Sequence, residues 1–277
     1  MEYVYFVLLI LGGLIAGSFA GMLGVGGAFL LVPLQFFVLT KTGYAPDIAM
    51  KVAIATALAV TLPTALNSAY RHSKRGTVFW KYAALIGTFG FLFSFASSFV
   101  ANYLPGSVLS FIFGIVVLAA ALRTSSYKDT NEDPANISQN YFKYAVCGAI
   151  MGTISGLTGI GGGIVVIPLM IFVLRFPFIN AVGTSSATIV FTSMGGIIGY
   201  FINGFDTVGL PPYSVGYINI LIFLILVIPS IIMSGVGASV THRVNQKYIR
   251  YTFSILTFII GATMIYKSLG IHLFDFI

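Results

Sequence analysis

Two glycine-rich segments of this chain share a pattern that suits the binding of an anion. Residues 17–34 read GSFAGMLGVGGAFLLVPL, and residues 152–169 read GTISGLTGIGGGIVVIPL. Glycine interrupts a helix, and it tolerates the backbone conformation that turns successive N–H groups toward one point. A half-helix that begins after such a break directs its positive dipole end and its free N–H groups forward. Two breaks that face each other could therefore hold an anion without an arginine.

The glycines of the two segments align at one constant offset and fall into two kinds. Gly17 and Gly21, like their counterparts Gly152 and Gly156, have the Gly-x-x-x-Gly spacing that is typical of close helix packing. The denser clusters exceed what packing needs, so we interpret them as helix breaks that contact a substrate. These candidate residues are Gly24, Gly26 and Gly27 in the first segment and Gly159, Gly161, Gly162 and Gly163 in the second.

A second paired motif supplies hydroxyl groups. The run AIATALA in the first half pairs with AVGTSSA in the second, which places Thr56 on Thr184, and Ser185 follows in the second half alone. Hydroxyls in membrane helices often bond to their own backbone. Their repetition at symmetric positions next to a glycine break favours substrate contact instead. Asn67, in the same expected helix as Thr56, is a further candidate.

The elements that must position these residues are membrane helices. Of the 277 residues, 58% are apolar and only 8% are charged, whereas soluble domains have about 25% charged residues. The longest stretches without a charged residue are 4–40, 52–70, 82–122, 144–174, 176–205 and 207–241. Because about 20 apolar residues cross a bilayer as a helix, the sequence predicts an all-α polytopic membrane protein with about eight hydrophobic helical segments. The first segment of each half is broken or re-entrant at its glycines.

The repeat divides the chain into two membrane halves. We expect a first membrane repeat at residues 1–122 and a second at residues 144–277, joined by a polar linker at residues 123–143. Five glycines and a proline that agree at one offset are very improbable by chance. The net charge of +7 arises from short loops and the linker, so it indicates membrane topology rather than a nucleic-acid partner.

The positive charges assign the loops to the two sides of the membrane. Lys and Arg gather in 71–81, 123–143 and 243–250, whereas 102–106 and 203–213 contain none. The positive-inside rule places the first three in the cytoplasm and the other two outside. We therefore expect a multi-pass protein of the cell (inner) membrane.

This assignment makes the two halves inverted repeats. Segment 144–174 must begin and end inside, as a re-entrant hairpin or as two short crossings, and the same reasoning places 41–47 outside. Inverted halves with glycine- and proline-interrupted helices at matching positions are typical of secondary transporters, which bind substrate near the bilayer midplane. No Asp, Glu, Lys or Arg lies well within a predicted span, which argues against a cation transporter.

Other kinds of chemistry find little support. Ser155 lies in a motif that resembles the serine motif of intramembrane proteases, but no histidine lies in a span to activate it, so we expect no enzyme. Cys147 is the single cysteine, which excludes a disulfide scaffold or a thiolate metal site. We expect no cofactor. His72 and His242 fall at cytoplasmic helix ends, where we interpret them as solvated loop residues; His72 could also attract anions.

The duplicated G-x-x-x-G-x-x-G-x-G-G…P segment, followed by A-V-G-T-S, resembles the sulfite exporter TauE/SafE family, also called the toluene sulfonate uptake permease family. The resemblance covers nearly the whole chain. It implies transport of sulfite, sulfonates or related sulfur compounds. The first half departs from the pattern around Thr56, where alanines replace Gly and Ser, so the resemblance favours the second-half site from Gly183 to Ser185.

The function predicted from these observations is a secondary transporter of a small sulfur-containing oxyanion. Its expected partners are a small anionic substrate and the lipid bilayer, and a homo-oligomer is left open. One alternative is an anion channel on the same fold. Another is a non-transporting membrane assembly protein, for which 123–143 is the one sizeable polar docking segment.

Overall fold

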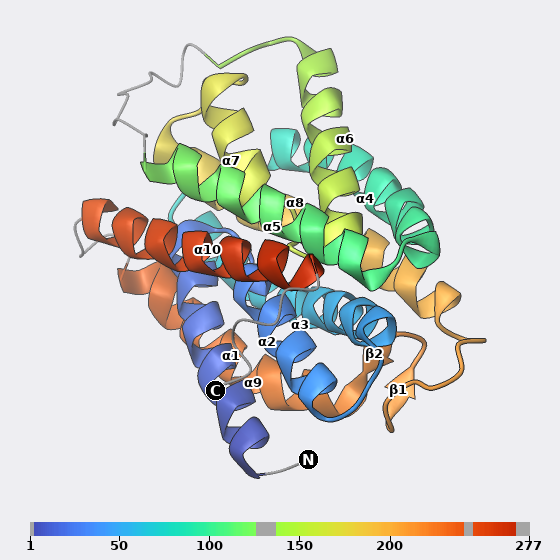
Figure 1. The fold of residues 1–277 in the computed structure, drawn as a ribbon. Coiled ribbons are helices and arrows are strands. Elements are labelled where there is room, and N and C mark those ends of the chain that lie inside the picture. The colour runs from blue at the N-terminus through green and yellow to red at the C-terminus, as the bar shows by residue number, and fades with distance from the viewer. Residues whose placement is uncertain (1–2, 126–136, 241–245, 270–277) are drawn as a thin grey trace.

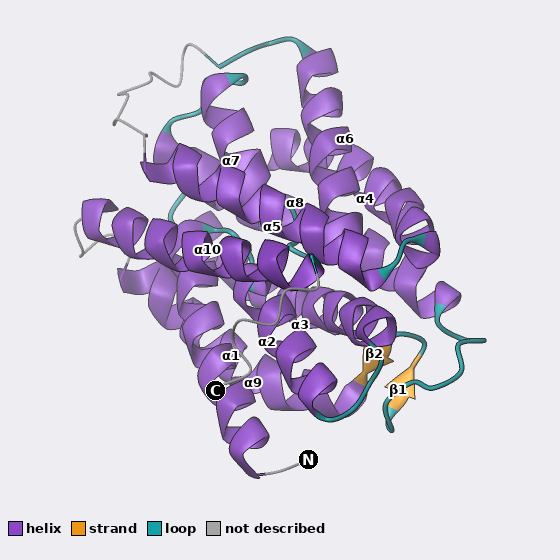
Figure 2. Ribbon diagram, viewed as in Figure 1, coloured by secondary structure: helices purple, strands orange, loops and turns teal. Residues whose placement is uncertain are grey.

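The computed structural model describes residues 3–125, 137–240 and 246–269, which form ten helices and one short β-hairpin (Figure 2). The first half contains α1 (Tyr3–Leu23), α2 (Ala28–Lys41), α3 (Pro46–Lys74), α4 (Trp80–Tyr103) and α5 (Gly106–Ser125). The second half contains α6 (Tyr141–Thr158), α7 (Gly163–Phe172), α8 (Phe178–Asn203), β1 (Ser214–Val215), β2 (Ile218–Asn219), α9 (Ile220–Val240) and α10 (Gln246–Ser268). Eight predicted segments become ten helices because two segments break at their glycines.

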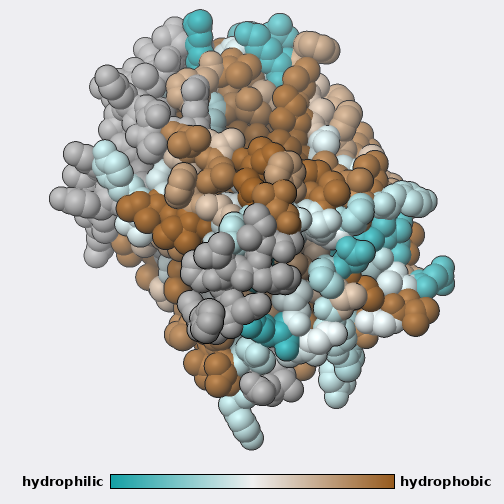
Figure 3. All heavy atoms as spheres, in the orientation of Figure 1, coloured by the Kyte–Doolittle hydropathy of each residue, from teal (hydrophilic) through white to brown (hydrophobic). Residues whose placement is uncertain are grey.

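Five of these helices, α1, α3, α4, α8 and α9, are long and apolar enough to cross a membrane. The outer face of the bundle is apolar as well. Ile228 and Ile232 of α9, for example, are about 60% exposed, and apolar side chains cover much of the face seen in Figure 3. Such a surface is stable in lipid but not in water, so the chain is an all-α multi-pass membrane protein, as predicted.

The two broken segments form hairpins that enter the bundle from opposite ends. In Figure 1, α1 runs from the N-terminus into the interior, and α2 returns toward the same end. On the other side, α6 runs inward, and α7 returns toward the end at which α6 begins. With 10 residues, α7 is about 15 Å long, which is half of the roughly 30 Å that a spanning helix needs. Both breaks therefore lie in the interior of the bundle.

One end of the molecule gathers segments around the N-terminus of α3. Asp47 Oδ1 accepts a hydrogen bond from the backbone N–H of Gly106 at 2.6 Å. Lys51 donates to the carbonyl of Asn102 at 2.6 Å, and the Tyr217 hydroxyl donates to Asn102 Oδ1 at 2.8 Å. The segments that meet here are 41–47, 102–106 and 203–219, which include those predicted to lie outside.

The opposite end collects the segments rich in positive charge. Asn180 Nδ2 donates to the carbonyl of Thr77, and Lys81 Nζ donates to the Tyr141 hydroxyl at 2.9 Å. Arg75 donates to a carbonyl in the last turn of α9. The described parts of the predicted cytoplasmic segments thus share one end. Residues 126–136 and 241–245, which contain other predicted cytoplasmic residues such as His242, lie outside the described residues.

The Gly-x-x-x-Gly pairs lie at close helix contacts, which confirms their interpretation as packing residues. A Cβ on Gly17 or Gly21 would overlap the backbone of Ser230 or Ser234 in α9. In the second half, a Cβ on Gly152 would overlap the backbone of Gly90 in α4. Because these contacts are made by backbone atoms, the helices approach as closely as two peptide chains can.

Replacing Gly21 with valine should therefore weaken the α1–α9 contact. Overpacking of this kind costs about 1–3 kcal/mol, which corresponds to a fall of about 5 °C in the unfolding temperature of the detergent-purified protein. The replacement Leu11→Ala, at a half-exposed position of the same helix, is the control and should shift the temperature much less. Equal shifts for both variants would show that α1 and α9 do not pack in this way.

Candidate functional site

The first break is a short left-handed turn between α1 and α2. Gly24, Gly26 and Gly27 have φ angles of +65°, +84° and +75°, a conformation that residues with a Cβ rarely adopt. Gly27 is the N-cap of α2, and no described side chain caps the N–H groups of that helix start. All residues from Leu23 to Phe29 are buried. The structure thus confirms that this cluster breaks a helix inside the protein.

The second break has the same geometry. Gly159, Gly161 and Gly162 have φ angles of +73°, +77° and +82°. Gly162 is the N-cap of α7, again without a side-chain cap, and α7 begins at Gly163. The two helices that follow the breaks therefore both present the uncapped N–H groups of a first turn within the bundle.

The two breaks touch each other. A Cβ built on Gly163 would lie 2.7 Å from Cα of Val25 and 2.9 Å from the carbonyl oxygen of Gly24. Gly26 and Gly161 face the same two side chains, Thr61 of α3 and Ile189 of α8. The start of α7 thus meets the first break between α3 and α8, and α2 begins from that same break, so the positive ends of two helix dipoles lie in one region.

Each break packs on the long helix of the other half. A Cβ on Gly24 would overlap the carbonyl oxygen of Val182 in α8, and a Cβ on Gly159 would lie 3.0 Å from Cα of Ile54 in α3. Ile54 and Val182 are equivalent positions in the paired sequence motifs. The break of the first half therefore contacts the second half at the same repeat position at which the break of the second half contacts the first.

Hydroxyl groups of α3 and α8 bind the carbonyl oxygens of the two breaks. Ser185 donates to the carbonyl oxygen of Gly24, in the first break, at 2.9 Å. Thr61 donates to the carbonyl of Gly26 at 3.1 Å, and Thr192 donates to that of Gly161 at 2.8 Å. These bonds fix the turns. The N–H groups of Gly24 and Gly159 donate to Ala20 and Ser155 at the ends of α1 and α6, so the groups that remain for a ligand are those of the first turns of α2 and α7.

Thr61 and Thr192 were not predicted as site residues. The sequence comparison selected hydroxyls at matching positions of the repeat, and Thr61 matches Ile189 instead. Thr192 matches Thr64, whose hydroxyl bonds to Val60 of its own helix. For Thr192 the signal is the repeat itself, because Thr64 and Thr192 match at the same offset as Thr56 and Thr184. Thr61 has no such counterpart, and its contact with the break depends on packing.

Ser193 supplies a hydroxyl that no described group of the protein binds. It is fully buried on α8, and its Oγ makes no hydrogen bond within the part of the chain that the structure describes. A Cβ on Gly161 would lie 3.7 Å from this oxygen, so the hydroxyl stands beside the second break. Because a buried hydroxyl without a partner costs free energy, it is a natural ligand contact.

The comparison with known proteins agrees with this architecture. The family model described as sulfite exporter TauE/SafE matches residues 9–264. The chain belongs to this family. A probable membrane transporter protein of Methanocaldococcus jannaschii is 34% identical over 260 residues, which cover 93% of this chain and 94% of that protein.

Two further relatives of this TauE/SafE chain also align along nearly their whole lengths. The probable membrane transporter protein YunE of Bacillus subtilis is 28% identical, with 95% of this chain and 98% of that protein covered. A probable membrane transporter protein of Haemophilus influenzae is 25% identical, with 96% and 100% covered. The chain is therefore a membrane transporter of the TauE/SafE family.

The paired threonines lie at the starts of two other helices in this TauE/SafE fold. Thr56 Oγ1 accepts a hydrogen bond from the backbone N–H of Asn219, just before α9, at 2.9 Å. Thr184 Oγ1 accepts one from the N–H of Phe79, the N-cap of α4, at 3.1 Å. Both hydroxyls are buried and hold a helix of the other half. Direct contact of Thr56 and Thr184 with substrate stays a prediction.

The variant Thr56→Val should reveal this positioning contact. The variant leaves the buried N–H of Asn219 without an acceptor, at a cost of about 1–3 kcal/mol. The thermal unfolding temperature of the purified protein should fall, whereas Thr56→Ser, which keeps the oxygen, should unfold near the wild-type temperature. If valine were as stable as serine, the hydroxyl would have no part in holding α9.

Asn67 lies farther along α3, six residues after Thr61. Its Nδ2 donates to the carbonyl of Ile231 and to Ser234 Oγ, both at 2.9 Å. The amide therefore links α3 to α9. Its role as a substrate contact likewise stays a prediction.

His72 is not a solvated loop residue, so that prediction was wrong. It lies in α3 and is only 1% exposed, because α3 continues to Lys74 and turns this side chain toward α1. Within the described residues, His72 is the one buried side chain among Asp, Glu, Lys, Arg and His. Among the described residues, the breaks are thus surrounded by hydroxyls, backbone and apolar side chains such as Ile189 and Met151 rather than by charges.

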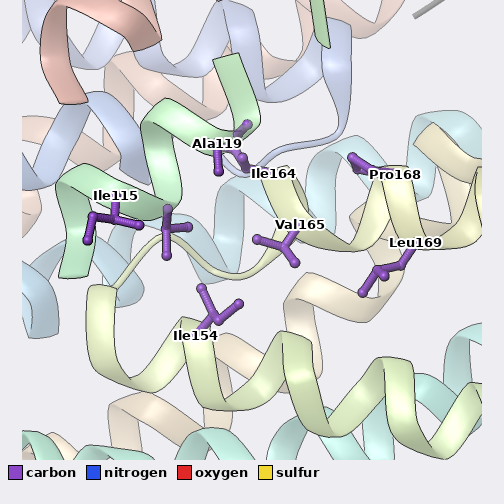
Figure 4. A pocket seen from close by; sticks show the side chains of 9 residues that line it. Ile115, Ala119, Ile154, Ile164, Val165, Pro168 and Leu169 are labelled. Carbon is purple, nitrogen blue, oxygen red and sulfur yellow. The ribbon is translucent and has the colours of Figure 1, made fainter. Parts of the chain in front are cut away.

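A groove of about 310 Å³ lies on the outer side of the second break, between α5, α6 and α7 (Figure 4). Only Ile, Val, Ala, Pro and Leu line it, among them Ile154, Ile164 and Pro168. Such a lining offers no group that binds an anion. The groove is therefore distinct in chemistry from the polar region between the breaks.

Proposed function

We propose that this chain is a secondary transporter, or permease, that carries a small sulfur-containing oxyanion such as sulfite or an organosulfonate. The observation that supports this proposal is the contact between the two glycine breaks inside the bundle, each of which leads into a helix whose N-cap is a glycine. Such helix starts bind anions through their N–H groups and dipoles. The family description names a sulfite exporter, which supports the sulfur chemistry.

The proposed substrate site is the space between the first turns of α2 and α7. Its backbone comes from the glycines that form the breaks, namely Gly24, Gly26, Gly27, Gly159, Gly161, Gly162 and Gly163. Ser185, Thr61 and Thr192 hold the breaks in shape, and the Ser193 hydroxyl donates to the anion. Thr56, Asn67 and Thr184 position the surrounding helices.

The two halves, residues 1–122 and 144–277, act as inverted repeats joined by the linker 123–143. This is supported by the hairpins that enter from opposite ends and by the exchanged contacts at Gly24 and Gly159. The end that contains Arg71 and Lys81 is the cytoplasmic one by the positive-inside rule. Rocking of one half against the other would expose the site alternately to each side.

Flux into proteoliposomes tests the proposal. Purified protein would be reconstituted, and the uptake of sulfite, thiosulfate, taurine and sulfoacetate would be compared with protein-free vesicles. Saturable flux of at least one of these sulfur compounds is expected, with competition among them. Movement of a cationic or uncharged solute alone would refute the proposal, and a rate above about 10⁵ per second would indicate a channel instead.

A further inference from the structure

A buried histidine lies next to the first break, at the end rich in positive charge. His72 Nε2 is 3.4 Å from the carbonyl oxygen of Gly21, in the last turn of α1. The carbonyl can only accept, so this nitrogen donates. The proposed function gives this imidazole no role, although histidine is the side chain that changes charge near neutral pH.

Polar groups connect His72 to the proposed site. Ser68 lies one turn from His72 on α3, and its hydroxyl is 3.1 Å from that of Ser186. A Cβ on Gly24 would lie 3.0 Å from Ser186 Oγ, so this pair reaches the first break. All three side chains are about 1% exposed. Since Gly21 precedes Gly24 by three residues, His72 is about one helical turn, roughly 5 Å, from the break.

Among the described residues, the charged groups near His72 are positive. Arg71, Lys74 and Arg75 share the end of α3 with it, and Arg71 packs against Gly235 of α9 while Arg75 donates to Ala238. The helices around His72, namely α1, α8 and α9, contain no Asp, Glu, Lys, Arg or His within their described ranges. A protonated His72 would add a fourth positive charge, which an anion bound nearby would offset.

We propose that His72 binds a proton together with an anion that enters the site from the cytoplasmic side. The proton forms an N–H bond on the imidazole as the anion arrives, and it is released when the anion leaves. Binding of each is strengthened by the other, because thermodynamic coupling is reciprocal. This inference rests on the proposed anion site, and it adds the residue that makes the site sensitive to pH.

Anion binding at two pH values tests this inference. Thiosulfate and sulfoacetate are suitable probes because their charge is constant between pH 6 and pH 8, whereas that of sulfite is not. For the full-length wild type we expect binding about tenfold tighter at pH 6 than at pH 8, with proton uptake on binding in weakly buffered solution. His72→Gln, which keeps a donor to Gly21, should bind with the same affinity at both pH values and take up no proton.

The replacement His272→Gln is the matched histidine control and should keep the wild-type pH dependence. Wild-type binding that is equal at pH 6 and pH 8 would overturn the role of His72, and this result requires no variant to fold. A pH dependence that persists in His72→Gln would overturn it as well. Absence of binding and flux for every anion would instead refute the proposed anion site itself.

Discussion

Replacing Gly161 with alanine is expected to reduce anion flux by about 100-fold or more. Gly161 has a φ of +77°, so alanine would strain the backbone by about 1–2 kcal/mol. Its Cβ would also lie 3.2 Å from Ile189 and 3.3 Å from Thr61, which line both breaks. The turn would have to shift, and the N–H groups at the start of α7 would no longer converge on the anion.

The comparison with Gly43→Ala separates backbone strain from loss of the site. Gly43 also has a positive φ, of +94°, but a Cβ there would meet nothing within 4 Å. Uptake of the transported sulfur compound would be measured for both variants in proteoliposomes with matched protein content. Gly43→Ala should keep most of its flux. Equal flux for Gly161→Ala and the wild type would contradict the placement of the site at the second break.

Replacing Ser193 with alanine is expected to weaken anion binding by about 10- to 100-fold without lowering stability. The Ser193 hydroxyl is buried and has no partner among the described residues, so its removal breaks no hydrogen bond of the fold. A hydrogen bond to a charged ligand contributes about 1.5–3 kcal/mol, which sets the expected loss of affinity. Binding and unfolding temperature would be measured on the same preparation.

Ser110→Ala provides the matched control for Ser193→Ala. Ser110 is also a buried serine whose Oγ makes no described hydrogen bond, but it lies on α5 rather than beside a break. It should retain wild-type affinity and flux. If the two serine variants behaved alike, Ser193 would be an ordinary packing residue and the anion would be held elsewhere.

The architecture was largely accessible from sequence because membrane proteins obey strong rules. The lack of charges fixed the helical segments, and the spacing of Gly17 and Gly21 indicated a packing contact that the α1–α9 interface confirms. The clusters at Gly24 and Gly159 indicated helix breaks, since glycine alone adopts positive φ freely. These features depend on local composition and residue spacing, which can be read directly from the sequence.

The side chains around the breaks were less accessible. The repeat predicts Thr56 and Thr184 as substrate contacts. Their hydroxyls accept hydrogen bonds from backbone N–H groups at the starts of α9 and α4, and these bonds depend on how the two halves pack together. Thr192 and Ser193 contact the second break only because α8 packs against it. His72 is buried because α3 extends past the expected helix end. Such tertiary contacts leave no periodic pattern in one sequence.

A structure of the protein with bound selenite, a heavier analogue of sulfite, tests the anion site most directly. The anomalous signal of selenium would locate the anion independently of any variant. We predict a single strong peak between the first turns of α2 and α7, within hydrogen-bond distance of the Gly163 N–H and the Ser193 hydroxyl. A peak confined to the Arg71–Arg75 end of the bundle, with no density between the two breaks, would contradict it.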